Sequence, residues 1–389
     1  MSSVINTNIA SLNTQRNLSS SQASLNTSIQ RLSSGLRINS AKDDAAGLAI
    51  AERMNAQVRG LNVAARNAND GVSLAQTAEG SLGKIGDMLQ RMRELSVQSA
   101  NATNSATDRT ALQAEVSQLR DEIGRVAGNT AFNGTKLLDG SFTAANFQVG
   151  ANSGETITVA SITDATTAKL GSTNFASTTL AVGTATNLGA VADGDIKIQG
   201  ATGAPVSIGA LGTATSSSER IGQIAAAINN VSGKTGVNAY IDSNGALALT
   251  SANNIAANAI SVSGGVAALA DIGLTTNAAG TATATVGIDK LDISSFAGAS
   301  LAIKQVDSAL DQVNGARAKL GALQSRFENA VSNIQIQSEN TTAARSRIMD
   351  TDFASETANL TRSQILQQAG NAMLSQANQL PQQVLSLLR

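Results

Sequence analysis

The longest regular pattern in the chain lies between residues 44 and 101, where apolar residues recur every seven positions. The repeat runs through Met54, Leu61, Ala68, Ala75, Leu82 and Leu89. Apolar companions fill the half-steps, and their offset changes from four residues to three along the stretch. A straight helix of 3.6 residues per turn drifts in this way against a strict repeat of seven. The pattern therefore predicts one amphipathic helix of roughly 85 Å, far longer than a globular core needs.

Two further stretches show the same periodicity. One lies between residues 107 and 128, and its apolar positions are Leu112, Val116, Leu119, Ile123 and Val126. The other lies late in the chain, and its column is Val306, Val313, Leu320, Phe327, Ile334, the polar Thr341 and Ile348. Two early helices and one late helix with apolar stripes predict a bundle that is closed by segments far apart in sequence.

The two ends of the chain repeat the pattern more weakly. Their apolar positions are Leu25, Ile29, Leu32 and Leu36 at the N-terminus and Leu366, Met373, Leu380, Val384 and Leu387 at the C-terminus. Both ends are rich in Ser, Asn and Gln. A helix with so narrow an apolar stripe is marginal in water without a partner. We therefore expect a pair of terminal helices that become ordered on assembly, with these residues as the assembly seams.

The middle of the chain, residues 166–296, has a different pattern. Short alternating runs such as Asp195–Gln199 and Gly245–Thr250 predict strands. Ser216 and Glu219 form a capping box ahead of three spaced isoleucines, which predicts one helix. The predicted fold is therefore mainly α: a coiled-coil or helical bundle formed by the N- and C-terminal segments, with an inserted β-rich outer domain.

The composition excludes several function classes. The chain has no His and no Cys, which leaves no zinc finger, catalytic triad, haem site or iron–sulfur cluster. The formal net charge is -1 and basic runs are absent, so the chain has little electrostatic footprint for nucleic acid. We expect no cofactor, no metal and no nucleic-acid partner.

The N-terminal residues carry neither the basic region nor the apolar region of a signal peptide. No run of about eighteen apolar residues occurs, so we expect no membrane insertion. By these rules alone the protein is expected in the cytoplasm.

One set of short motifs raises an enzymatic alternative. Ser81–Lys84, Ser172–Asn174 and Lys234–Gly236 follow the order of the three motifs of penicillin-recognising serine enzymes. Ser, Thr, Asn and Gly are so frequent here that such triplets arise by chance. Ser81 also lies inside the longest predicted helix, away from any helix N-terminus that could form an oxyanion hole. We therefore expect no enzyme, and keep the serine enzyme only as a remote alternative.

Motifs at both ends carry a more specific resemblance. They are Val4–Asn8, Arg31–Gly47, Arg66–Gly71, Leu89–Leu95, Phe132–Gly134, Phe147–Asn152, Ser346–Asp350, Gln364–Ala369 and Val384–Arg389. Together they resemble the terminal signatures of bacterial flagellins, over residues 1–165 and 297–389. Residues 215–262 resemble the small β-containing insert that is often seen in flagellins.

The resemblance implies a structural subunit that polymerises into the flagellar filament. It implies an inner coiled-coil domain (1–43 plus 351–389), a long-helix bundle with a β-hairpin (44–165 plus 297–350) and a variable outer domain (166–296). It also implies secretion through the flagellum's own export channel, which accounts for the missing signal peptide. The implied partners are other copies of the chain, an export chaperone, and hook-junction and cap proteins.

The same resemblance implies a host partner. In several flagellins a Toll-like innate immune receptor grips the long-helix face, and matching the motifs places its anchors at Arg91, Leu95 and Glu115. Arg91 and Leu95 are four residues apart and offset from the seam, so we expect both to be exposed. The alternative is that all three are ordinary surface or inter-subunit contacts.

Two further possibilities follow from the family. A hook–filament junction protein shares the end signatures, but the closing run Val384–Arg389 favours a filament flagellin. Some flagellins carry a zinc protease in the variable middle, and the absence of His excludes that activity here.

Overall fold

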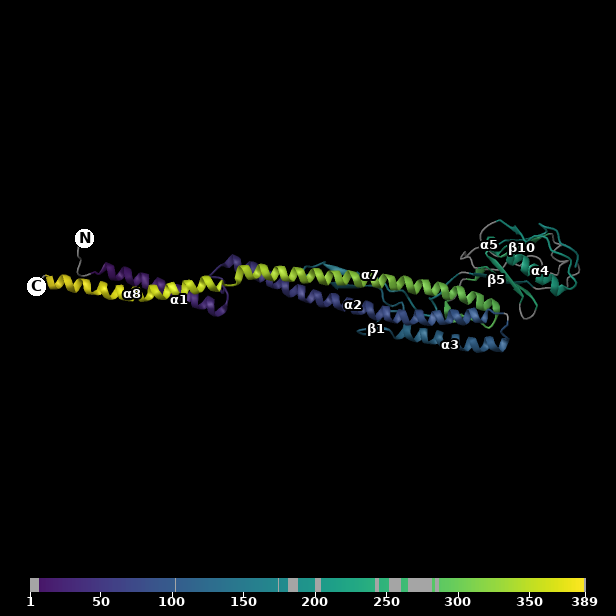
Figure 1. The fold of residues 1–389 in the computed structure, drawn as a ribbon, viewed down its shortest axis with the longest axis horizontal. Helices are drawn as coiled ribbons and strands as arrows, with labels where there is room; N and C mark the ends of the chain where they lie inside the picture. The colour runs from purple at the N-terminus through teal and green to yellow at the C-terminus, as the bar shows by residue number, and fades with distance from the viewer. Residues whose placement is uncertain are drawn as a thin grey trace. The chain divides into compact units, whose positions relative to one another are not determined.

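The computed structural model describes residues 7–101, 103–173, 175–180, 188–199, 204–241, 245–251, 260–264, 282–283 and 287–387. Within these ranges the helices are α1 (Ile9–Ser34), α2 (Ala45–Ser99), α3 (Ala106–Asn129), α4 (Ser217–Asn230), α5 (Ser232–Thr235), the 3-10 helix η1 (Ile288–Lys290), α7 (Phe296–Met349) and α8 (Phe353–Leu387). Figure 1 shows long helices from both ends of the chain and a middle that contains strands. The predicted fold class is confirmed.

The strands are short. They are β1 (Ala131–Phe132), β2 (Thr135–Lys136), β3 (Ala145–Gln148), β4 (Thr156–Val159), β5 (Phe175–Leu180), β6 (Ile196–Gln199), β7 (Val206–Ser207), β8 (Val237–Ile241), β9 (Leu247–Ser251), β10 (Ser261–Gly264) and β11 (Ala282–Thr283). β1 pairs with β2 and β3 with β4, while the middle holds sheets of order β11-β5-β9-β8 and β10-β6-β7. The β1–β2 turn places Asn133 and Gly134 at φ 47° and 81°, the left-handed pair that a tight hairpin prefers.

Contacts divide the chain into two compact units. The first comprises Met1–Asn69, Phe147–Ile157 and Glu328–Arg389, and the second comprises Asp70–Asn146 and Thr158–Phe327.

In the first unit, α1 begins and ends at clear signals. The Oδ1 atom of Asn8 accepts the N–H of Ser11 at 3.1 Å, and the chain leaves the helix at Gly35 with φ 72°. α8 lies along α1, so closely that a Cβ on Gly370 would come within 3.2 Å of Leu18 Cδ1. Both helices are present in the single chain, and each covers part of the other. That they become ordered on assembly stays a prediction.

The remainder of the first unit is the N-terminal part of α2 against the C-terminal part of α7. Leu61, Ala64 and Ile334 form its buried core, with Val149 and Ala151 packed beside them. Gly60 allows the chain after β3 to approach, since a Cβ there would lie 3.1 Å from the Cβ of Ala151.

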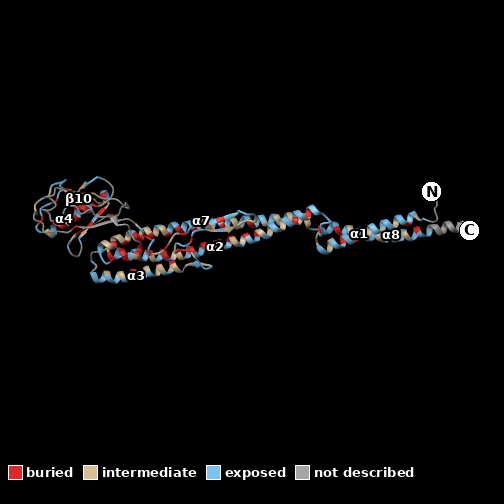
Figure 2. Cartoon of the chain, turned by 180° about the vertical axis from the view of Figure 1, so that it is seen from behind, coloured by how far each residue is buried: buried red, intermediate tan, exposed pale blue. Residues whose placement is uncertain are grey.

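In the second unit, the predicted seam is confirmed. The buried members of the α2 and α7 columns are Ala75, Leu82, Leu89, Val306, Val313, Leu320 and Phe327. Figure 2 shows this seam as buried residues on the facing sides of α2 and α7. The largest side chain is Phe327, which is fully buried, and a Cβ on Gly71 would come within 2.5 Å of its Cζ. The ring therefore occupies the space that a missing side chain leaves on α2.

α3 closes the bundle from a third side. Ser105 and Asp108 form a capping box: the Ser105 Oγ accepts the Asp108 N–H at 3.2 Å, and the Asp108 carboxylate accepts the Ser105 N–H at 2.9 Å. The hydrogen bonds from Ser105, first from its side chain and then from its backbone, lower the pKa of Asp108. Val116 and Ile123 are buried as the pattern predicted.

The segment before α7, which the expected outer domain of residues 166–296 includes, contacts the bundle helices. The Ser99 Oγ donates to the Ile293 carbonyl at 2.6 Å, and the Gln113 Nε2 donates to the Leu291 carbonyl at 3.1 Å. Ile288 and Leu291 are buried. The buried side chains of this segment therefore add to the core of the helices.

The strand-rich middle has a core of its own. The predicted strands at 195–199 and 245–250 correspond to β6 and β9, and the predicted helix to α4. Ser216 caps α4 through its Oγ, which accepts the Glu219 N–H at 3.2 Å. The Glu219 carboxylate departs from the expected reciprocal bond and accepts from Thr215 instead, which lowers its pKa. Arg220 is buried and donates to the Gly212 carbonyl at 2.9 Å, which holds the preceding loop.

Candidate functional site

The contact between α1 and α8 includes several polar interactions. The Ser11 Oγ donates to the Asn378 Oδ1 at 2.8 Å, and the Gln367 Nε2 donates to the Gln22 Oε1 at 2.9 Å. The Asn8 Nδ2 donates to a backbone carbonyl of α8 at 2.7 Å. Sequence reasoning missed these residues, because Ser, Asn and Gln on a helix face leave no hydrophobic period to detect.

A partly buried ion pair also joins the two helices. Arg31 Nη1 lies 3.7 Å from a Glu356 carboxylate oxygen, and the Glu356 side chain is 10% exposed. At this distance the pair is an electrostatic contact rather than a close hydrogen bond. Together with the amide and hydroxyl contacts, this ion pair fixes how the two helices are aligned along their length.

The apolar residues of the terminal pair are divided between that contact and the surface. Leu25 is buried, and Leu32 and Leu36 are half-buried. The strongly exposed ones are Ile9 at 69%, Leu12 at 49%, Ile29 at 50%, Ile365 at 60%, Leu366 at 50% and Met373 at 61%. The side chains of the remaining expected seam residues, Leu380, Val384 and Leu387, lie outside the described part of the chain. The pair therefore presents an exposed apolar surface.

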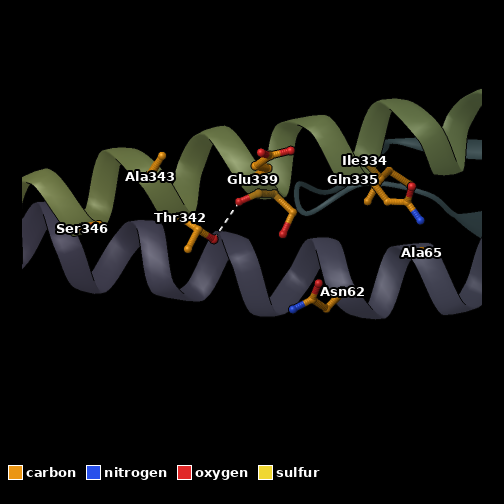
Figure 3. Close-up of a pocket in the computed structure, with 9 residues that line it drawn as sticks. Asn62, Ala65, Ile334, Gln335, Glu339, Thr342, Ala343 and Ser346 are labelled. Atoms are coloured by element: carbon orange, nitrogen blue, oxygen red, sulfur yellow. Dashed lines mark hydrogen bonds between the residues drawn. The ribbon is translucent and has the colours of Figure 1, made fainter.

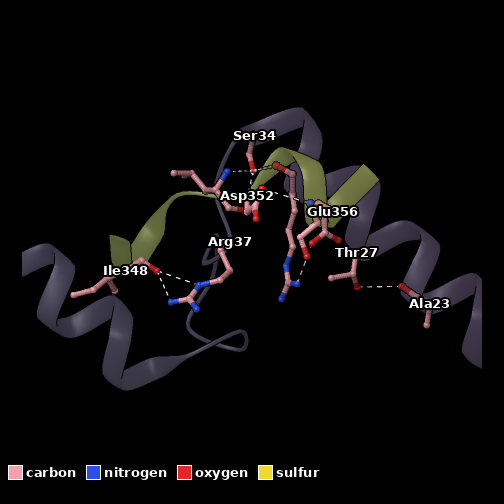
Figure 4. A network of polar contacts seen from close by, with 10 residues as sticks. Ala23, Thr27, Ser34, Arg37, Ile348, Asp352 and Glu356 are labelled. Carbon is pink, nitrogen blue, oxygen red and sulfur yellow. Dashed lines mark hydrogen bonds and ion pairs between the residues drawn. The ribbon is translucent and has the colours of Figure 1, made fainter. Parts of the chain in front are cut away.

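Two chain segments cross next to the terminal pair, as Figure 4 shows. The Arg37 guanidinium donates to the Ile348 carbonyl through Nη2 at 2.7 Å and Nε at 3.2 Å. The Arg37 N–H donates to the Met349 carbonyl at 2.6 Å. A cation on the last carbonyls of a helix satisfies free acceptors and complements the helix dipole. Arg37 thus caps the C-terminus of α7 from a distant part of the sequence.

Asp43 shapes the loop that follows. Its carboxylate accepts the N–H groups of Asn39 at 3.1 Å and Ser40 at 2.9 Å, and the Ser40 hydroxyl at 3.1 Å. The two backbone hydrogen bonds, from Asn39 first and then Ser40, lower the pKa of Asp43 below its usual value. The loop is therefore held by a charged acceptor.

A surface hollow lies between α2 and α7 in the first unit, and Figure 3 shows its lining. Ile334 contributes apolar surface, and the small side chains Ala65 and Ala343 leave the space open. Glu339 is its one charged lining residue. A single carboxylate among hydroxyls and amides supplies no paired acid and base.

Arg91 and Glu115 join α2 to α3 on the surface of the second unit. The Arg91 Nε donates to the Glu115 Oε1 at 2.9 Å, and its Nη1 donates to the Glu94 Oε2 at 3.0 Å. The hydrogen bonds to Glu94 first and Glu115 second raise the pKa of Arg91. The side chains of Arg91 and Glu115 are 49% and 45% exposed. The structure therefore brings together two of the three expected receptor residues, in the open.

Leu95 corrects the expectation that all three are accessible. Its side chain is only 1% exposed. The sequence argument assumed that α2 buries one narrow seam. α3 packs on a second side of α2 in this stretch, and the wider buried arc includes Leu95.

The comparisons with known proteins match these features. The N-terminal helical region of bacterial flagellin matches residues 5–143, and its C-terminal helical region matches residues 303–388, which together exceed half of the chain. The chain belongs to the bacterial flagellins. The flagellin hook IN motif also matches residues 195–253, within the strand-rich middle.

Relatives of this flagellin match along the whole chain. Flagellin D of Vibrio cholerae is 43% identical over 99% of both chains. The B-type flagellin of Pseudomonas aeruginosa is 41% identical over 100% of both chains. Among solved structures, FliC from Burkholderia pseudomallei is 25% identical over 66% of this chain and 99% of that chain, with a TM-score of 0.38.

This flagellin is a structural subunit of the bacterial flagellar filament, where it serves motility. Full-length identity to filament flagellins decides against the hook–filament junction alternative. The flagellin family is structural.

The described residues of the serine-enzyme motifs also lack the surroundings of an active site. The Lys84 Nζ lies 3.7 Å from a carboxylate oxygen of Asp87. Ser81 lies in the middle of α2, where the backbone N–H groups are used by the helix itself. Asn174 lies outside the described residues. No helix in the described part of the chain is both long and apolar enough to cross a membrane.

Proposed function

We propose that the α1–α8 pair, within an inner domain of residues 1–43 and 351–389, is the element that polymerises this flagellin. The observation that carries the proposal is the exposed apolar surface on a pair whose internal contact is partly polar. A neighbouring copy that covers these side chains gains roughly 1.5–3 kcal/mol for each one that becomes fully buried. The seam residues Leu366 and Met373 lie on this surface.

Truncation tests this assignment. A chain that lacks residues 1–40 and 351–389 is expected to keep the helical circular dichroism of the bundle and to form no filaments on seeding. A chain that lacks only the strand-rich middle serves as the control of similar size and is expected to polymerise. Filaments from the truncated chain, seen by electron microscopy, would contradict the proposal.

We also propose that the subunit leaves the cell through the flagellar export channel and acts without enzymatic activity. The chain has no Cys and only 2 Pro, which suits passage as an unfolded chain through a narrow channel. The partners proposed for this route are an export chaperone and the hook-junction and cap proteins. Secretion should cease in cells without a working flagellar export apparatus, and a labelled β-lactam should leave Ser81 unmodified.

A second proposed role is that of a ligand for a Toll-like innate immune receptor, with Arg91 and Glu115 as anchors. Two observations support this role: both side chains are exposed, and their opposite charges lie next to each other on the surface. Exposed Arg residues at interface centres often cost ≥ ~2 kcal/mol on truncation. Leu95 is excluded as a contact residue because it is buried.

The receptor role is tested in a reporter-cell assay with monomeric protein. Arg91→Ala and Glu115→Ala are each expected to lower potency at least about tenfold, which corresponds to ~1.4 kcal/mol. Arg125→Ala is the matched control, since Arg125 is an exposed α3 residue that pairs with Glu122 at 2.7 Å. Equal potency of the wild type and all three folded variants would remove the role.

A further inference from the structure

We propose that Met373 is a site of reversible oxidation that decides whether a free subunit can join the filament. This inference rests on the proposed role of the α1–α8 pair in polymerisation. Met373 is 61% exposed, and Leu366, seven residues earlier on α8, is 50% exposed. Seven residues make about two helical turns, so the two side chains share one face. Figure 2 shows this part of α8 as mostly exposed.

Met373 differs from the other methionines of the described chain. Met92 is fully buried in the bundle seam, and Met54, Met88 and Met349 are half-buried. An oxidant must reach the sulfur atom before it can react. Among the described methionines, Met373 is therefore the most accessible target.

The oxidant is a hydroperoxide, in the simplest case hydrogen peroxide. The sulfur lone pair attacks one peroxide oxygen, so that an S–O bond forms and the O–O bond breaks. The second oxygen leaves with the electron pair and takes up the remaining proton as water. Sulfur is oxidised by two electrons and the peroxide is reduced. The product, methionine sulfoxide, carries a strongly polar group where the thioether was apolar.

This polar group opposes assembly at the surface on which Met373 lies. A copy that covers Leu366 and the sulfoxide must remove water from the S–O group, which is unfavourable unless a donor replaces it. Once a subunit is assembled, the same neighbour shields the sulfur from peroxide. Oxidation therefore acts on free subunits and spares those already in the filament.

The change is reversible by known chemistry. Methionine sulfoxide reductases return the thioether with electrons from a thiol, and two enzymes are needed because the sulfoxide has two epimers. This reversal separates a specific block at sulfur from general damage to the chain, which the reductases would not repair.

The experiment treats free subunits and preformed filaments with the same concentration of hydrogen peroxide. Peptide mass spectrometry is expected to find Met373 oxidised ahead of Met88 in free subunits and protected in filaments. The critical concentration for seeded polymerisation of treated subunits should rise about tenfold, equivalent to ~1.4 kcal/mol. Treatment with both sulfoxide reductases and a thiol should restore it.

Two variants complete the test. Met373→Leu keeps the side-chain volume without a sulfur, and its subunits should polymerise after peroxide as well as before. Met88→Leu is the matched control and should remain as sensitive as the wild type. The inference is overturned if oxidised Met373 leaves polymerisation unchanged, if Met373→Leu stays sensitive, or if Met373 reacts no faster than Met88. None of these results touches the polymerisation role, which fails only if the truncated chain forms filaments.

Discussion

The terminal pair and the long-helix bundle are both built from amphipathic helices, yet they use their apolar residues in opposite ways. The bundle buries them: Leu82, Leu89 and Val313 are 0%, 0% and 1% exposed. The terminal pair joins partly through polar residues such as Ser11 and Asn378, and it leaves Ile365, Leu366 and Met373 exposed. The bundle thus buries its apolar seam within the chain, whereas the terminal pair keeps several large apolar side chains at its surface.

This difference gives each region its own energetic role. A buried apolar seam stabilises a single subunit whatever its concentration. An exposed apolar surface adds nothing until a second copy covers it, so its contribution depends on subunit concentration. A filament subunit needs both properties, because it must fold alone and then assemble.

The largest expected effect tests where the bundle ends. Replacement of residues 174–286 by a short Gly/Ser linker should leave the bundle's melting temperature nearly unchanged. The linker can be short because the Ile288 N–H donates to the Leu170 carbonyl at 3.0 Å. Replacement of residues 170–292 should lower the bundle's melting temperature strongly. It removes Leu170, Ile288 and Leu291, and the burial of each side chain contributes roughly 1.5–3 kcal/mol to the free energy of unfolding. If circular dichroism gives the two deletion variants the same melting temperature, the boundary between the outer domain and the bundle lies at residue 297 as the sequence predicts.

Phe327→Ala is the next largest change and acts on the bundle alone. It removes a fully buried ring from the α2–α7 seam and leaves a cavity, at an expected cost of about 3–5 kcal/mol in the free energy of unfolding. Urea denaturation of the monomer measures this loss. A loss below 1 kcal/mol, on the order of a surface change, would mean that the ring does not hold the helices together.

The sequence predicts the elements that show a regular hydrophobic period. The seams of α2 and α7 run for many turns, so their heptad columns predict both helices. The sequence also predicts the pair of terminal helices but not its polar contacts, because residues such as Gln22 and Gln367 pair by hydrogen bonding, which has no periodic signature.

The candidate sites show the same limit. The motif placed Arg91 and Glu115 correctly on one surface, but Leu95 was expected there and is buried. A one-dimensional pattern describes one seam per helix, and it cannot tell where a third helix widens the buried arc. The apolar segment around Leu291 was assigned to the outer domain for a similar reason: its contacts with α3 arise only in three dimensions.

Gly71→Ala sharpens the account of the bundle with a smaller effect. Ala in place of Gly inside a helix normally stabilises by about 1 kcal/mol. At Gly71 the new Cβ would lie 2.5 Å from a buried ring atom of Phe327, so the ring must shift, and overpacking costs about 1–3 kcal/mol. We expect net destabilisation in urea melts. Gly80→Ala, where nothing lies within 4 Å, is the control and should stabilise; the same sign at both positions would refute the packing argument.

Leu366→Ala moves to the terminal pair, where the expected effect on the monomer is small. Leu366 is 50% exposed, so its truncation should change the free energy of unfolding by less than about 0.5 kcal/mol. The critical concentration for filament formation should nevertheless rise several-fold, because the proposed contact with a second copy covers this side chain. A variant that destabilises the monomer but polymerises normally would reverse the comparison drawn between the two regions.

The smallest expected effect concerns the loop after α1 and depends on pH. The pKa of Asp43 is lowered in the folded chain by hydrogen bonds from Asn39 and Ser40. Its stabilising contribution is therefore complete well above the unfolded value of about 3.9 and is lost as the pH falls through the lower folded value.

The variant Asp43→Asn tests this contribution. It should speed amide hydrogen exchange at Asn39 and Ser40 near neutral pH, where the wild-type carboxylate is charged. As the pH falls through this lowered pKa, the wild-type loop should open similarly, so the protection that the carboxylate gives should shrink. Loss of the neutral-pH difference between the two chains would show that backbone geometry alone, without the charge, holds the loop.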